Sequence, residues 1–170
     1  MALDGPDDAL RVLETALGGA ALGFDEGGVC QVTVQDAFVL NLVKSSDAAL
    51  RLVTYLDAQI QPMTARFLLN AMTENHLGGA GPHGRFGLHR DMGILALEET
   101  IACQGLDPAV FEARVLGFVK TAAYWVLNAD NLFDDPNALE DQVHATGARM
   151  AEDVFASYAS DDADAFVVKV

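Results

Sequence analysis

The chain has 170 residues, a length that fits one domain around one hydrophobic core. Its 10 Lys and Arg residues stand against 25 Asp and Glu residues, which gives a formal net charge of −15. Nucleic acids and anionic membranes repel such a surface, so the composition excludes both as partners. Hydrophobic residues nevertheless make up 51% of the chain, which also excludes the composition of a disordered protein.

The two cysteines, Cys30 and Cys103, provide neither a disulfide framework nor a metal-binding pair. This cysteine usage suits a reducing compartment. The N-terminal segment is acidic and amphipathic, unlike a secretion signal, and no apolar stretch approaches the roughly 20 residues that span a bilayer. We therefore expect a cytoplasmic protein.

An amphipathic helix is predicted at the start of the chain. Pro6 suits a first helical turn, and the acids that follow it complement the positive end of the helix dipole. Leu10, Leu13 and Leu17 recur at helical spacing and form one apolar stripe. Glycines at 18 and 19 weaken the far end of this helix.

Three strands with alternating polarity follow and predict an antiparallel meander. They cover residues 30–34, 38–43 and 50–57, with turn signals at 25–28, 35–36 and 44–47. The alternation assigns one set of side chains to the core: Phe38, Leu40, Leu42 and Leu52. It assigns Val39, Val43 and Val53 to the opposite face, and an apolar second face must be covered by something.

The second half of the chain predicts a helix, a hairpin and a long helix. Pro62 opens the first helix, which ends near His76 before a glycine-rich loop. Residues 85–90 and 94–99 form the hairpin, in which Gly87 marks a bulge or a close backbone approach. Asp107 and Pro108 begin the long helix, which is expected to end near residue 131.

The expected fold class is therefore α+β: a helix, a three-stranded antiparallel meander, a helix, two strands and a long helix, in a domain over residues 1–132. Residues 133–170 carry nine acids against two bases. We expect this segment to be an acidic C-terminal extension that is partly helical or disordered.

No catalytic or metal-binding constellation is predicted, and no cofactor. The four histidines lack zinc-ligand spacing, and the kinase-like tripeptide at 89–91 lacks every other kinase motif. One alternative stays open: a small enzyme or ligand-binding domain with a pocket between sheet and long helix. Its candidate residues are His89, Glu98 and Tyr124.

The ordered elements resemble the class I chaperones of type III secretion, the Tir chaperone (CesT-like) family. The resemblance covers residues 10–132 and is carried by four features: the first-helix leucines, the turn and strand at 24–34, the stretch at 67–72, and the aromatic pair at 124–125. The glycine-rich segment 77–84 and the acidic extension depart from the family pattern.

The resemblance implies a cytosolic, homodimeric, non-enzymatic chaperone. Such a protein binds the N-terminal region of a secreted effector or translocator and keeps it non-globular and export-competent. The candidate partner-binding residues are Leu13, Leu17, Val39, Val43 and Val53, and simple core packing is the alternative for each of them.

The resemblance also implies a dimer interface built by the second helix, Met63 to His76, and the strand after it. The candidate residues of this interface are Phe67, Met72 and Phe86. A regulatory binding module of the same fold, which sequesters a secretion regulator, is the alternative function.

Overall fold

The computed structural model describes residues 2–35, 37–56, 65–77, 81, 83–89, 91 and 93–127. At 65–67 and 77 it describes the backbone but not the side chains. The predicted extension at 133–170 lies outside the described residues. The elements are α1 (Pro6–Ala16), β1 (Val29–Val34), β2 (Phe38–Ser46), β3 (Ala49–Leu56), α2 (Ala65–Leu77), β4 (Arg85–His89), β5 (Ile94–Ala102) and α3 (Pro108–Leu127).

The five strands form one antiparallel sheet in the order β1-β2-β3-β5-β4. The meander of β1, β2 and β3 is as predicted, and the later hairpin joins it through β5. This arrangement confirms the predicted α+β fold class. Of the helices in the described ranges, none is long and apolar enough to cross a membrane.

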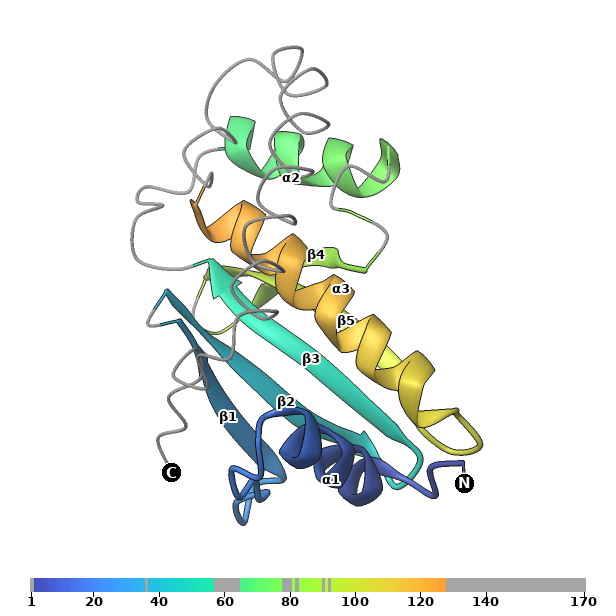
Figure 1. Cartoon of the computed structure of the whole chain (residues 1–170). Helices are drawn as coiled ribbons and strands as arrows, with labels where there is room; N and C mark the ends of the chain where they lie inside the picture. Colours follow the sequence, from blue (N-terminus) through green and yellow to red (C-terminus); the bar gives the residue numbers. More distant parts are fainter. Residues whose placement is uncertain are drawn as a thin grey trace.

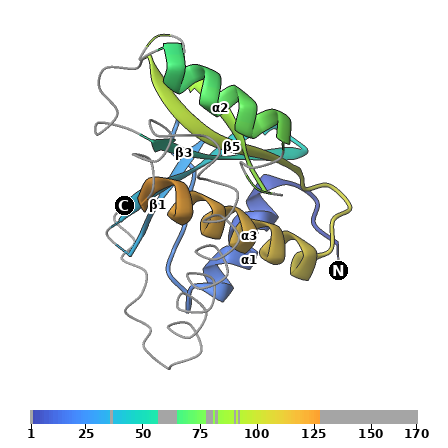
Figure 2. The same cartoon turned by 90° about the horizontal axis from the view of Figure 1, so that it is seen from above.

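Helices α1 and α3 lie together on one face of the sheet (Figures 1 and 2). We call this the helix-covered face. The core lies between α3 and this face, and its largest fully buried side chains are Trp125, Phe111 and Phe118. Helix α2 lies beside the β4 end of the sheet, away from α1.

Local hydrogen bonds explain where the elements begin. The Ala109 N–H donates to the Asp107 carboxylate over 2.9 Å, so Asp107 caps α3 as predicted. The Asp25 carboxylate accepts hydrogen bonds from the N–H groups of Gly27 and Val29, at 2.9 and 2.8 Å. This turn sets the start of β1.

Two strand boundaries differ from the predictions. Strand β2 continues to Ser46 with a register shift after Lys44, so the predicted turn at 44–47 was placed too early. Strand β5 runs to Ala102, three residues beyond its predicted end, because β3 pairs with it as far as Ala49. Pairing with β3 therefore extended both strands beyond their alternating patterns.

Gly87 marks neither the predicted bulge nor a close approach of another backbone. A Cβ atom at this position would lie 2.8 Å from a carboxylate oxygen of Glu98 on the neighbouring strand β5. The register of β4 and β5 shows no shift across Gly87. A side chain at position 87 would therefore have to displace the end of the Glu98 side chain.

Candidate functional site

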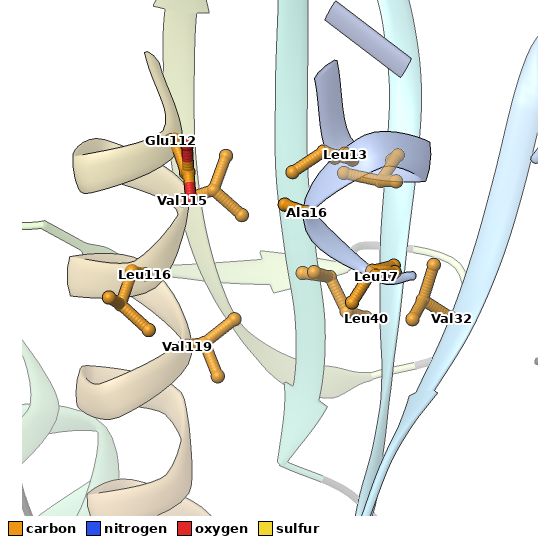
Figure 3. Close-up of a pocket in the computed structure, with 10 residues that line it drawn as sticks. Leu13, Ala16, Leu17, Val32, Leu40, Glu112, Val115, Leu116 and Val119 are labelled. Carbon is orange, nitrogen blue, oxygen red and sulfur yellow. The ribbon is translucent and has the colours of Figure 1, made fainter. Parts of the chain in front are cut away.

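An open apolar groove of about 260 Å³ runs between α1, α3 and the sheet (Figure 3). We call it the α1–α3 groove. Leucine, valine and alanine side chains form most of its lining. The lining residues are Leu13, Ala16, Leu17, Val32, Leu40, Leu42, Glu112, Val115, Leu116 and Val119.

The α1 wall of the groove contains Leu13 and Leu17, which lie one helical turn apart. Leu13 is buried, with 7% of its surface exposed, while Leu17 is half-buried. The Leu17 N–H donates to the Leu13 carbonyl over 2.8 Å, which holds Leu17 in position just after α1. The chain then turns away at Gly18 and Gly19, both with positive φ.

The α3 wall contains Glu112, Val115, Leu116 and Val119, a spacing that places all four on one side of the helix. Val32 from β1 and two leucines from β2 form the floor. The floor belongs to the helix-covered face, so the groove is a gap between two helices that share one sheet.

Glu112 is the one charged residue among those that line the groove. Its side chain is exposed, and within the described part of the chain it makes no hydrogen bond or ion pair. The groove is therefore an apolar surface with one carboxylate at an end of its α3 wall, and no described residue pairs with that carboxylate.

The predicted partner-binding residues form two separate sets. Leu13 and Leu17 line the groove. Val39, Val43 and Val53 lie on the opposite face of the sheet, because they alternate along their strands with the residues beneath the helices. Val39 is 41% exposed, Val43 is half-buried and Val53 is 5% exposed, so Val39 offers the most surface of these three.

The predicted dimer-interface residues also differ in exposure. Met72 on α2 is 68% exposed, and Leu69, one turn before it, is 64% exposed. Phe86 is buried within the protomer, with its ring centroid 4.9 Å from that of Trp125 in an edge-to-face arrangement. The side chain of Phe67 lies outside the described residues.

The residues of the alternative enzyme site are not gathered at one place. The His89 ring packs against Tyr55, with centroids 6.0 Å apart, on the face opposite the helices. Tyr124 is buried on α3 against Trp125. Glu98 lies near Arg51 with 3.8 Å between charged atoms. Within the described ranges, His, Cys, Asp and Glu form no group able to hold a metal ion.

A second cavity, of about 420 Å³, is polar and lies at the start of β4. Its lining residues are Arg51, Gly84, Arg85, Glu98, Glu99, Thr100 and Arg114. Glu99 is mostly buried here and accepts hydrogen bonds from the Arg114 guanidinium. Two ion pairs, Arg51–Glu98 and Arg114–Glu99, account for most of its charges, and only Glu99 among them is mostly buried.

Sequence reasoning did not identify the α3 wall of the groove. The sequence did contain a signal for this wall. Leu116 is apolar, yet it lies outside the buried stripe of α3, which includes Phe111, Val115, Phe118 and Val119. Apolar residues that widen a helix stripe beyond what one sheet covers indicate a second contact surface. Which element faces that surface follows from the packing of α1 beside α3.

The fold and groove define a class of protein: a small α+β domain with an open apolar groove between two helices and a sheet. The sequence comparison identifies the family. Residues 8–126 match the Tir chaperone protein (CesT) family, and the chain belongs to this family. The predicted resemblance is thereby confirmed, as is the predicted class of type III secretion chaperone. No curated protein sequence matches the chain.

Solved structures show the same fold. The chain is similar to one in the ExsC-ExsE complex, with a TM-score of 0.57 and 19% identity over 73% of this chain and 95% of that one. It is similar to one in the HopA1-SchA chaperone-effector complex, with a TM-score of 0.55 and 21% identity over 71% and 91%. A third is the complex of the Yersinia pestis type III secretion chaperone SycH with a fragment of YscM2, with a TM-score of 0.53 and 17% identity over 70% and 98%.

Proposed function

We propose that this protein is a cytoplasmic, non-enzymatic type III secretion chaperone that holds the N-terminal region of an effector or translocator in a non-globular, export-competent form. The observation that carries the proposal is the open α1–α3 groove in a member of the Tir chaperone family. A net charge of −15 keeps the protein soluble while the apolar groove stays exposed. The groove therefore still offers apolar surface to a partner.

An extended partner fits the arrangement of β1 and the groove. Among the described strands, β1 lies at the edge of the sheet and pairs with β2 alone. A partner segment can add a strand to such an edge and place its apolar side chains in a neighbouring groove. Val32 of β1 is part of the groove floor, so both contacts are adjacent.

We also propose that the protein is a homodimer through α2. Among the side chains of α2 that the structure describes, Leu69 and Met72 are the most exposed large hydrophobic ones, and their spacing puts them on one side of the helix. Two copies related by a twofold axis would bury this side against itself. Light scattering should then give twice the 18.1 kDa chain mass, and a Leu69→Glu/Met72→Glu variant should give the chain mass.

Copurification from a secreting cell tests the chaperone proposal. The wild-type protein should recover one partner through its N-terminal region, and limited proteolysis should show a protected stretch in that partner. Leu17→Glu and Leu116→Glu place charges in the groove at partly exposed positions and should abolish recovery.

Val110→Glu is the matched control, because Val110 is 48% exposed on α3 but does not line the groove. Recovery of the same partner by wild type, Leu17→Glu and Leu116→Glu alike would contradict the proposal. The identity of the partner separates two functions: a secreted effector supports delivery, and a transcriptional regulator supports a regulatory module of the same fold.

A further inference from the structure

We infer that Glu112 makes the α1–α3 groove selective for partner segments that carry a Lys or Arg beside their apolar residues. The inference rests on the proposed function, because it names the chemistry of the segment that the same groove binds. It concerns one residue that the family pattern in the sequence did not single out.

Glu112 has no charge partner in the described part of the protomer. Two basic residues at or near α1 already have acidic partners. Arg11 pairs with Asp8, and Lys44 lies 2.9 Å from Asp7. A cation for Glu112 is therefore expected from the bound segment.

Binding of a segment also changes the hydration of Glu112. A segment seated in the groove removes water from the carboxylate of Glu112, and burying an unpaired charge is costly. A segment with an apolar residue opposite Glu112 suffers this cost, while a segment with Lys or Arg there offsets it with an ion pair. The ion pair favours basic segments and the desolvation cost disfavours purely apolar ones, so both effects select the same segments.

Glu112 lies at one end of the α3 wall of the groove. Glu112 and Val119 are seven residues apart on α3, about 10 Å at 1.5 Å per residue. The selected segment therefore has a basic residue at one end of an apolar stretch of that length, which is about three residues of extended chain. The net charge of −15 attracts such basic segments from a distance.

Three synthetic fluorescent peptides test the inference. All share a short leucine run within a glutamine host; one has Lys before the run, one has Lys after it, and one has glutamine at both positions. Anisotropy at low salt should show that wild type binds one Lys peptide about two- to fivefold more tightly than the other, the range of a solvated ion pair. The two Lys peptides carry the same charge, so the long-range attraction of the acidic chain acts equally on both.

The Glu112→Gln variant should bind the two Lys peptides alike, and Glu112→Arg should disfavour the preferred Lys peptide. Glu26→Gln is the matched control, because Glu26 is exposed in the turn before β1 and should leave the preference intact. A preference that persists in Glu112→Gln, or binding of all peptides by wild type without preference, would overturn the inference alone. Failure of wild type to bind any peptide would contradict the groove itself, and with it the proposed function.

Discussion

The side chain of Asn75 on α2 forms two hydrogen bonds with the backbone of Phe86 on β4. Its amide oxygen accepts from the Phe86 N–H over 2.7 Å, and its amide nitrogen donates to the Phe86 carbonyl over 2.9 Å. In the described sheet β4 is an edge strand. Asn75 therefore imitates a neighbouring strand, and it ties α2 to the end of the sheet.

Replacing Asn75 with alanine should lower the free energy of unfolding by about 1–3 kcal/mol, because two partly buried backbone groups of Phe86 lose their partner. Urea denaturation followed by the fluorescence of Trp125, the chain's one tryptophan, measures the change. His76→Ala, at an exposed position of α2, should change the value by less than about 0.5 kcal/mol. Equal effects of the two variants would show that the Asn75 contacts are not stabilising.

The ring of His83 lies against the backbone of Gly117. A Cβ atom at 117 would lie 2.3 Å from His83 Cδ2, so Gly117→Ala should destabilise the protein by about 1–3 kcal/mol despite the higher helix propensity of alanine. The double variant His83→Ala/Gly117→Ala removes the clash and should be more stable than Gly117→Ala alone. Thermal unfolding of the four proteins of this cycle gives the coupling, and additive effects would contradict a direct contact.

The pair of Glu99 and Arg114 links β5 to α3. Glu99 is 11% exposed at its side chain, and Arg114 Nε donates to Glu99 Oε1 over 2.9 Å. Arg114→Met should cost about 1–3 kcal/mol, because the carboxylate would keep only His83 nearby, with 3.8 Å between His83 Nδ1 and Glu99 Oε2.

Two variants control the Arg114 experiment, again by urea denaturation. Glu99→Gln/Arg114→Met should be more stable than Arg114→Met, because no buried charge remains. Arg11→Met, which removes an exposed pair with Asp8, should cost about 0–1 kcal/mol. If Arg114→Met costs no more than Arg11→Met, burial of the pair has no energetic consequence.

Stability should fall at alkaline pH. Burial raises the pKa of the Cys30 and Cys103 thiols, and burial together with the charge of Glu74 raises the pKa of Tyr124. The folded state therefore holds these protons more tightly than the unfolded chain does. Their contribution is complete below about pH 8.5, the ordinary thiol pKa, and declines as pH rises through the folded-state values.

Urea midpoints at pH 8 and pH 10 measure this decline. Cys103→Val should show a smaller difference between the two midpoints, because one of the shifted groups is gone. The native thiols should also react slowly with an alkylating reagent at pH 8, since both are buried. A midpoint that is unchanged or higher at pH 10 would contradict the expected direction.

Local patterns were enough to place most elements of this protein. The alternation in β1, β2 and β3, the Asp107–Pro108 start of α3 and the leucine stripe of α1 are all short-range signals, because side-chain periodicity and capping act over a few residues. The same patterns assigned Val39 and Val43 to the face opposite the helices, in agreement with the strand register.

The functional surface required long-range contacts. Leu13 and Val115 are about a hundred residues apart in the chain, and they meet at one groove because α1 and α3 share one face of the sheet. No periodicity within either helix specifies that meeting, nor the position of the Glu112 carboxylate beside it. Phe86 likewise carries the apolar signature of an interface residue, and packing against Trp125 turned it into a core residue. Periodicity tells which side of an element is apolar, whereas the packing of distant elements decides how much of that side stays open to a partner.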